Sequence, residues 1–415
     1  MKMKRFMPWR SALLGSALLC LAGFSGASFA SQPVRIGVIA PASAIDGKSI
    51  FHAAELAAKH INAAGGIDGR PVKLYKYDDH ASTADAVRAF QRAVRQDHVK
   101  AVVGVFISEI ALALEPWSGR LKTPLIISGA VSDDIGKQIH AHYKQFKYTF
   151  HTYINSVFVT KTACKYARDT IEKPYHVHRA VVLSENANWT KPVVKEYKKC
   201  LPSDGFKLVD VINFDPSTSD FTPIYNRIEG DHAQVIMAAL AHVGVKPVVQ
   251  WRQGQVPAIY AGISAQATSS NFWAATNGGA NTVMTMTTGS SGVPVTPKTP
   301  AFYKAYKAAF HSEPAYNSYT TYDSFFILKN AIEGVKSGSY NSMVAAISHT
   351  NLEGVSGHLQ FYGPNAKYTH DVRYNKSTVG VATQWQNGKQ VVVWPPRVAQ
   401  AKVRLPSFVS LQGSK

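Results

Sequence analysis

The sequence of 415 residues lacks the short motifs that mark several large enzyme classes. No G-x-G-x-x-G follows its first apolar strand, and G-x-x-x-x-G-K-[ST], G-x-S-x-G and H-E-x-x-H are absent throughout. These absences argue against a dinucleotide site, a P-loop, an α/β-hydrolase nucleophile and a zinc peptidase. Beyond the N-terminal segment, no apolar run is long enough to cross a membrane. We therefore predict a protein that is not an enzyme and carries no cofactor.

Acidic residues are few compared with basic ones. The 45 lysines and arginines against 26 aspartates and glutamates give a formal net charge of +19, a balance that nucleic-acid-binding proteins often show. The cations are scattered, however, without a dense basic run or zinc-finger spacing, so we predict no nucleic-acid partner. The positive electrostatic potential of such a chain favours anionic ligands or surfaces.

The first thirty residues have the pattern of a cleavable signal peptide. An apolar stretch, Leu13 to Phe24, is too short for a comfortable span, and small residues precede Ser31 at the usual cleavage positions. The basic residues before the stretch are Lys2, Lys4, Arg5 and Arg10. Lipidation at Cys20 is disfavoured because Leu19 is bulkier than the residue usual at that position. We predict export to the periplasm and a mature chain that begins at Ser31.

Two cysteines remain after this cleavage, Cys164 and Cys200. Both lie on predicted helices that flank one predicted strand, and an exported chain folds in an oxidising compartment. A disulfide between them would close a loop of about 36 residues. Two buried free thiols are the alternative, and the pair alone cannot complete a zinc site.

The stretch from Val34 to Asp79 predicts a βαβ unit. Val34 to Ile39 reads as a buried strand, and Ile50 to Ile61 has apolar residues at helical spacing. Gly65 and Gly66 suit a left-handed cap that ends the helix, and Val72 to Tyr77 forms the next strand.

Strands and helices keep alternating after this unit, which predicts an α/β fold with parallel sheets. One continuous sheet of so many strands is improbable, so we predict two doubly wound lobes. Near the C-terminus, Gln384–Gln386 and Val391–Val393 flank Asn387-Gly388, a pattern typical of a β-hairpin. The expected strands are 34–39, 72–77, 99–105, 124–127, 147–150, 179–183, 206–214, 234–240 and 258–260.

The amino-acid sequence of this opening βαβ unit closely resembles that of the branched-chain amino-acid-binding family of periplasmic solute receptors. In that family a helix ending Ile-Asn-x-x-Gly-Gly-Ile-x-Gly-Arg leads into a strand ending Asp-Asp, and here these are Ile61 to Arg70 and Asp78-Asp79. The resemblance covers nearly all of the mature chain. It implies the type I periplasmic-binding-protein fold and a protein that captures small molecules for an ABC importer without catalysis.

The resemblance also implies how the lobes divide. The hinge crossings are expected near 148–153, 283–287 and 359–362. The expected segments are a signal peptide at 1–30, a first lobe at 31–150 plus 284–355, a second lobe at 151–283 plus 356–400, and a tail at 401–415.

Two loops of the first lobe are candidates for a ligand site. Open α/β sheets bind ligands outside the carboxyl ends of their strands, and hydroxyls with free backbone N–H groups suit a carboxylate. Such loops follow the strands at 99–105 and 124–127. The resemblance implies that Ser108, Ser132 and the backbone of Ala130 grip the ligand's carboxylate. Simple helix capping is the alternative role for each serine.

Other positions that the resemblance places at the cleft are Asp46, Tyr322 and Trp189. Asp46 follows the first strand and matches a position that lines the cleft, although it could be an ordinary turn aspartate. Tyr322 matches a cleft tyrosine, with core packing as the alternative. Trp189 matches an aromatic that covers the ligand, with structural packing as the alternative. His151 and Tyr153, on the first hinge crossing, are weaker candidates.

One departure from the family pattern bears on the ligand. Amino-acid binders usually hold the ligand's ammonium with a glutamate in the loop that is Ala261–Gln266 here, and this loop contains no acid. Burial of an ammonium against neutral groups would cost several kcal/mol. Either Asp46 or Glu109 replaces the glutamate, or the ligand lacks an ammonium. Aromatic or short organic acids and amides therefore compete with leucine-like ligands.

The expected partners are a small-molecule ligand and an ABC permease at the inner membrane, with the protein a monomer. A sensor that presents its ligand to a membrane kinase or chemoreceptor would have the same sequence features. A secreted α/β enzyme is the less favoured alternative. His140 with His142, and His176 with His178, have a spacing that could share a metal, but no nearby acid or cysteine completes either pair, so we predict exposed histidines and no metal.

Overall fold

The computed structural model describes residues 1, 3, 32–335 and 339–410. It separates Met1–Gln32 from one compact unit, Pro33–Lys415, and the features below all belong to that unit. The predicted signal peptide and its cleavage point lie outside the described residues. Among the described residues, every helix is too short or too polar to span a bilayer.

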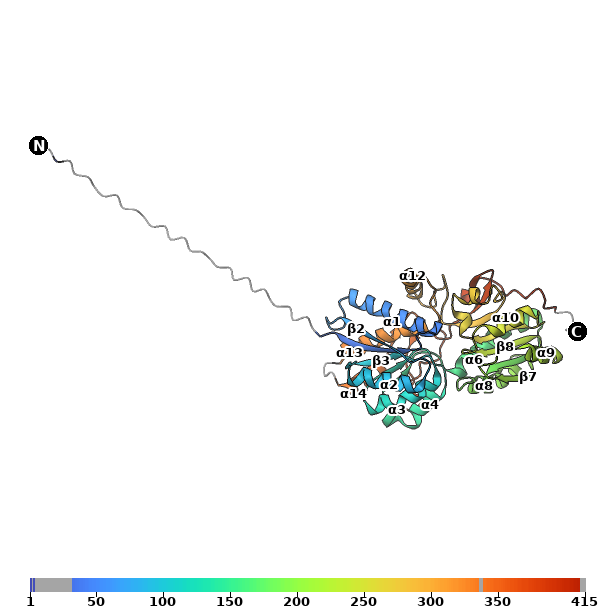
Figure 1. The fold of residues 1–415 in the computed structure, drawn as a ribbon, viewed down its shortest axis with the longest axis horizontal. Coiled ribbons are helices and arrows are strands. Elements are labelled where there is room, and N and C mark those ends of the chain that lie inside the picture. Colours follow the sequence, from blue (N-terminus) through green and yellow to red (C-terminus); the bar gives the residue numbers. More distant parts are fainter. Residues whose placement is uncertain (2, 4–31, 336–338, 411–415) are drawn as a thin grey trace. The chain divides into compact units, whose positions relative to one another are not determined.

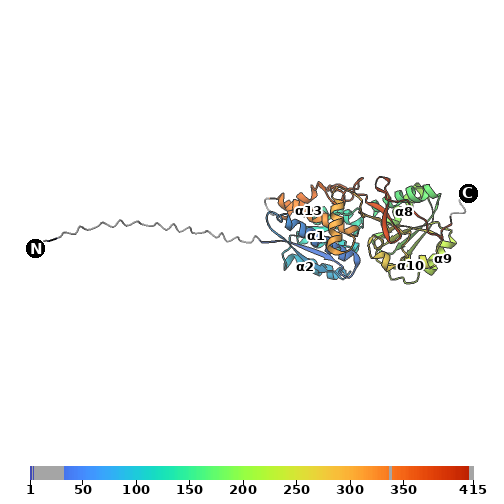
Figure 2. The same cartoon turned by 90° about the horizontal axis from the view of Figure 1, so that it is seen from above.

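The first sheet is a five-stranded parallel sheet with the order β2-β1-β3-β4-β5. Strands β3 and β4 are buried along their whole length, because helices cover both faces of the sheet. Figures 1 and 2 show α1, α2 and α13 gathered around it. Its elements are β1 (Val34–Ala40), α1 (Ile45–Ala63), β2 (Val72–Asp78), α2 (Thr83–Arg95), β3 (Ala101–Gly104), α3 (Ser108–Arg120), β4 (Leu125–Ile127), α4 (Asp134–Ala141), α5 (Tyr143–Phe146) and β5 (Thr149–His151), joined later by α13 (Tyr316–Glu333).

The second sheet is also parallel and has four strands in the order β7-β6-β8-β9. Figure 1 places α6, α8, α9 and α10 around it. Its elements are α6 (Ser156–Ala167), which continues through a π-helical turn η1 (Arg168–Glu172) into α7 (Lys173–Tyr175), then β6 (Arg179–Glu185), α8 (Thr190–Ser203), β7 (Lys207–Phe214), α9 (Thr222–Gly230), β8 (Val235–Leu240), α10 (Lys246–Gln253) and β9 (Ile259–Ser264). Two separate parallel sheets confirm the predicted α/β class.

A third, antiparallel sheet has the order β10-β13-β14. Strands β13 (Val381–Gln386) and β14 (Lys389–Trp394) are the predicted hairpin, and its turn residues Asn387 and Gly388 both have positive φ, as a tight hairpin turn requires. The remaining elements are η2 (Gln266–Thr268), α11 (Phe272–Ala275), β10 (Met284–Thr287), α12 (Thr299–Phe310), α14 (Tyr340–Ser348), β11 (Leu352–Glu353), β12 (His358–Leu359) and η3 (Pro396–Val398).

A steric constraint explains why glycine follows α1. Gly66 has φ 83°, its N–H donates to Ile61 O at 2.9 Å, and a Cβ at this position would lie 2.2 Å from Arg70 O. Only glycine fits there without moving the backbone. The side chain of Asn62 then ties the helix to β2, because it donates to Val72 O (3.0 Å) and accepts from Val72 N (2.6 Å).

Two contacts bear on the predicted lobe boundaries. β10, expected in the first lobe, pairs with β13, and Thr285 Oγ1 in β10 donates to Ser264 O at the end of β9. Asp371, expected in the second lobe, forms a parallel bridge with His151 of β5. β10 therefore lies beside the second sheet, and Asp371 lies beside the first.

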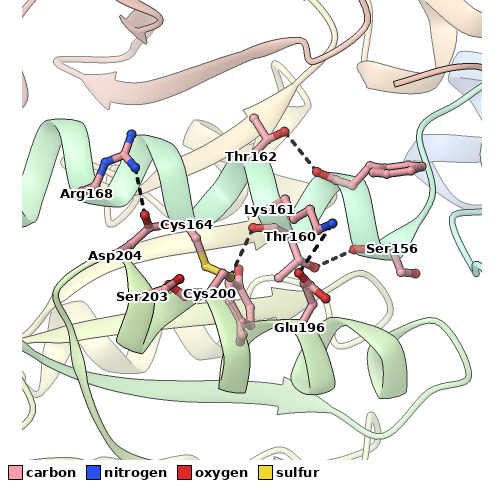
Figure 3. The surroundings of a disulfide bond; sticks show 12 residues. Ser156, Thr160, Lys161, Thr162, Cys164, Arg168, Glu196, Cys200, Ser203 and Asp204 are labelled. Carbon is pink, nitrogen blue, oxygen red and sulfur yellow. Dashed lines mark hydrogen bonds and ion pairs between the residues drawn. A yellow bond between two sulfur atoms is a disulfide. The ribbon is translucent and has the colours of Figure 1, made fainter. Parts of the chain in front are cut away.

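Cys164 and Cys200 form a disulfide that joins α6 to α8, with their Cα atoms 6.0 Å apart (Figure 3). Cys164 is fully buried where α6 packs against α8. Both helices cover the second sheet, so the bond fixes two neighbouring helices of one layer.

Removal of this bond is expected to lower the free energy of unfolding by about 3–4 kcal/mol, because the cross-link spans 36 residues and restricts the unfolded chain. Urea unfolding of the double variant Cys164→Ala, Cys200→Ala measures the loss. Reduced wild-type protein is the control, since it loses the bond but keeps both side chains. Equal unfolding midpoints for oxidised and reduced protein would contradict the expectation.

Candidate functional site

The loops after the carboxyl ends of both parallel sheets enclose one hollow. It is small and partly open to solvent. The lining is mainly apolar, with aromatic side chains from Phe106, Tyr153, Trp189 and Tyr316. Polar side chains in the lining come from Ser108, His242, Ser264 and Thr268. This combination of apolar walls with a few converging polar groups is typical of a small-molecule site. We call it the cleft.

Ser108 begins α3 and lies in the cleft, as predicted from its place after β3. The side chain is 2% exposed. Its Oγ accepts the N–H groups of Val131 (3.4 Å) and Ser132 (3.2 Å), which ties the loops after β3 and β4 together. Its own hydroxyl proton has no acceptor within the described residues, so it can donate to a ligand.

The other two predicted carboxylate contacts are engaged within the protein. The Ala130 N–H donates to Val105 O at 2.9 Å, and Ala130 O lies 2.6 Å from His151 Nε2. Ser132 Oγ donates to Asn188 Oδ1 (2.7 Å) and accepts from Asp134 N (3.3 Å). Neither residue lines the cleft, although their neighbours Gly129 and Val131 do.

Trp189 lies in the cleft immediately before α8, where it was predicted. The ring is buried, and its Nε1 donates to Glu185 Oε1 at 3.1 Å. Glu185 ends β6 and is completely buried. The hydrogen bond fixes the rotation of the indole, so Trp189 presents a rigid apolar surface to the cleft.

Glu185 also organises the loop that follows β8. Its Oε2 accepts three successive backbone N–H groups, from Ala241 (2.9 Å), His242 (2.8 Å) and Val243 (3.3 Å). Its Oε1 lies 2.6 Å from His242 Nδ1. Burial alone would raise the pKa of Glu185, but the hydrogen bond and charge of His242 and these N–H donors lower it below its ordinary value. Burial would likewise lower the pKa of His242, but the hydrogen bond and charge of Glu185 raise it.

Asp46 lies in the first turn of α1, is 1% exposed and does not line the cleft. Its Oδ2 accepts a 3.4 Å hydrogen bond from Gln266 Nε2, whereas Oδ1 has no partner among the described residues. Burial raises the pKa of Asp46 to about 7, partly offset by the nearby charge of His242. Glu109, the other predicted substitute for the family glutamate, accepts Asn188 N at 2.7 Å.

Tyr322 lies away from the cleft. Its hydroxyl is 2.8 Å from His60 Nδ1, and its ring packs against Phe302 with ring centres 4.8 Å apart. The tyrosine of α13 that does line the cleft is Tyr316, whose hydroxyl donates to Gly129 O at 2.6 Å. The two tyrosines are six residues apart on a helix with 3.6 residues per turn, so they occupy different faces.

The two hinge candidates differ in their placement. Tyr153 lines the cleft and packs against Tyr316 with ring centres 4.9 Å apart. His151 is fully buried between Ala130 O and Asp371 Oδ1 and is engaged within the protein. Within the described ranges, no group of three or more histidine, cysteine, aspartate or glutamate side chains could hold a metal ion.

Sequence reasoning missed His242, Glu185 and Tyr316. The rule that ligands bind at the carboxyl ends of strands would have found His242, which comes two residues after β8. No local signal marks Glu185, whose role depends on N–H groups more than fifty residues away.

Comparison with known proteins gives one consistent family. Residues 33–378 match a family model described as periplasmic binding protein. The Leu/Ile/Val-binding protein homolog 7 of Brucella melitensis is 24% identical over 403 residues, which cover 94% of this chain and 98% of that relative.

Solved structures agree with the fold. LivJ, the substrate-binding protein of a branched-chain amino acid transporter from Streptococcus pneumoniae, solved with isoleucine, is 23% identical. Its TM-score is 0.73, over 88% of this chain and 100% of LivJ. An ABC-transporter solute-binding protein from R. palustris, solved with benzoate, is 16% identical with TM-score 0.73, over 91% of this chain and 99% of that one. The chain therefore belongs to the periplasmic binding protein family, with the type I fold that its resemblance to the branched-chain amino-acid-binding proteins predicted.

Proposed function

We propose that this protein is the periplasmic substrate-binding component of an ABC importer and that its cleft captures a small carboxylate-bearing solute. The observation that carries the proposal is the pairing of Ser108, with a free hydroxyl proton, and His242 in the lining of one apolar cleft. Two structural relatives support it, since isoleucine and benzoate both carry a carboxylate. The solute is bound and released unchanged, and the loaded monomer docks on a permease at the inner membrane.

We further propose that the two parallel sheets are the cores of two lobes that close on the solute. The predicted division, 31–150 plus 284–355 and 151–283 plus 356–400, is modified in two places. β10 joins the second lobe because it pairs with β13, and the segment around Asp371 joins the first together with His151, because His151 belongs to β5 of the first sheet and bridges Asp371. Asn188, which accepts from Ser132 Oγ and donates to Glu109, then latches the closed lobes. The solute shifts this equilibrium through contacts that only the closed state provides.

A thermal-shift screen of the mature protein tests the proposal. The panel contains amino acids, their amides, aromatic acids and short organic acids, and a bound compound raises the melting temperature by mass action. We expect at least one carboxylate compound to bind at one molecule per protein chain and to be recovered chemically unchanged. Chemical conversion of the bound compound would favour the secreted-enzyme alternative, and binding of no carboxylate would contradict the proposal.

Ser108→Ala is expected to weaken the binding of that carboxylate about tenfold to hundredfold, because a hydrogen bond to a charged group is lost. Isothermal titration calorimetry measures the change. Ser348→Ala is the matched control, because that hydroxyl donates to Ala345 O at the end of α14 and lies outside the cleft. Unchanged affinity in Ser108→Ala would remove this serine from the site.

A further inference from the structure

Among the described residues that line the cleft, His242 is the one that can carry a positive charge, and the protein fixes its orientation. His242 Nδ1 faces Glu185 Oε1 at 2.6 Å, while the Glu185 carboxylate also holds the backbone N–H of His242 itself at 2.8 Å. Glu185 therefore holds His242 at both its ring and its backbone N–H. Its ring packs against Phe106 in a T-shaped arrangement, with ring centres 5.8 Å apart.

The opposite ring nitrogen of His242 is available to a ligand. The side chain lines the cleft and is 22% exposed, and Nε2 makes no hydrogen bond to any residue that the structure describes. Contact with the buried Glu185 carboxylate favours the protonated imidazole, in which Nε2–H is a charged donor. A solute carboxylate that reaches Nε2 would form a charge-assisted hydrogen bond in an apolar setting.

No lining residue offers an acid to an ammonium group. The lining contains hydroxyl, imidazole, aromatic and aliphatic side chains but no carboxylate, within the described residues. The nearby acids are engaged or buried behind the lining. Glu185 already accepts from the indole N–H of Trp189 and from three backbone N–H groups, in addition to its contact with the His242 ring. Glu109 accepts from Asn188 N. Asp46 is buried, outside the lining and beside Gln266. An ammonium would thus lose its water without gaining an anionic partner.

Resting on the proposed function, we propose that His242, held by Glu185, binds the solute's carboxylate and that the cleft selects monocarboxylates with an apolar or aromatic body and no ammonium group. Glu185 is the positioning residue, because it orients both the imidazole and the Trp189 ring that faces the body of the solute. Ser108, which follows a strand of the first sheet, donates a second hydrogen bond to the same solute carboxylate.

Matched pairs of compounds test the selectivity by calorimetry at pH 6.5. The pairs are 4-methylpentanoate with leucine and 3-phenylpropanoate with phenylalanine, which differ only in the ammonium group, and benzoate is tested beside them. We expect an ammonium-free acid to bind at least tenfold tighter than its amino acid. If an amino acid binds tighter than its partner, the inference falls and the proposed function stands. If no compound of this series binds at millimolar concentration, the inference falls, and the proposed function is decided by the wider thermal-shift panel.

His242→Gln tests the assigned cation with the tightest acid from this series. We expect at least a tenfold loss of affinity, whereas His140→Gln, on the exposed end of α4, should change nothing. The wild-type protein provides a second measurement that needs no folded variant. Its affinity for the acid should fall as the pH rises through the pKa of His242. Burial lowers this pKa, but Glu185 on β6, Glu109 on α3 and Asp46 on α1 together raise it above its ordinary value. A flat pH profile, or full affinity in folded His242→Gln, would overturn the assignment.

Discussion

Glu185→Gln is expected to lower the free energy of unfolding by about 3–5 kcal/mol, because it removes a completely buried, fully hydrogen-bonded carboxylate and leaves the partly buried His242 without its counter-ion. The Glu185 carboxylate is completely buried and accepts from the indole of Trp189 and from three backbone N–H groups. Replacing one oxygen by an amide group also places a donor where N–H or ring donors now point. Urea unfolding at constant pH measures the difference.

The effect should depend on pH in a defined direction. The pKa of Glu185 lies below its ordinary value of 4.5, so its stabilising contribution is present above pH 4.5 and is lost as the pH falls through the lowered pKa. The pKa of His242 lies above its ordinary value of 6.5, so its contribution is present below pH 6.5 and is lost as the pH rises through the raised pKa. The difference between wild type and Glu185→Gln should therefore be largest between pH 4.5 and 6.5.

A surface pair of the same chemistry is the control for this prediction. Glu353 Oε2 lies 3.2 Å from His358 Nδ1, and both side chains are more than 40% exposed. Glu353→Gln should change stability by less than about 1 kcal/mol, because water screens the pair. Equal effects of the two substitutions would show that burial of the Glu185 pair does not matter.

Asp46→Asn is expected to raise the free energy of unfolding by about 2–4 kcal/mol at pH 8. Burial raises the pKa of Asp46 from 3.8 to about 7, so at pH 8 the folded protein contains a buried carboxylate whose ionisation is less favourable than in the unfolded chain. Stability of the wild type should therefore fall between about pH 4 and 7, and the neutral amide removes this cost. Below pH 3.8 both side chains are neutral, and the two proteins should have similar stability.

Asp78 provides a control of opposite sign. Burial would raise its pKa, but the N–H groups of Ala42 and His80 hydrogen-bond to its carboxylate and lower it. Asp78→Asn should therefore destabilise the protein at pH 8, where Asp46→Asn stabilises it. Denaturant titrations at pH 4 and pH 8 measure both variants. A stability of Asp46→Asn equal to wild type at pH 8 would show that Asp46 is not buried as an uncompensated carboxyl.

Much of the fold follows from local patterns that the sequence displays directly. Apolar runs such as 34–39 and 234–240 form strands of the two parallel sheets, and Asn387-Gly388 forms the hairpin turn. The pairing of distant segments could not be predicted in this way. The bridge between His151 and Asp371 joins residues 220 positions apart, and neither flanking segment has a pattern that identifies its partner.

The positions of some candidate residues could be predicted from the sequence. Ser108 was expected from its place after a strand of a parallel sheet and Trp189 from the family resemblance, and both line the cleft, although their contact with a ligand stays a prediction. It was harder to predict which tyrosine of α13 faces the cleft, because this helix is buried on most sides and has both polar and apolar residues in contact with the rest of the protein. The Glu185–His242 pair depends on contact between two loops, so a single sequence contains no spacing that reveals it.

A crystal structure of the mature protein with its tightest-binding carboxylate tests the central claim most directly. We predict one molecule in the cleft, with its carboxylate oxygens about 3 Å from Ser108 Oγ and His242 Nε2 and its apolar body against Trp189. The Glu185–His242 contact should be preserved. A solute bound elsewhere, or one whose ammonium contacts Asp46 while His242 faces away, would contradict the account.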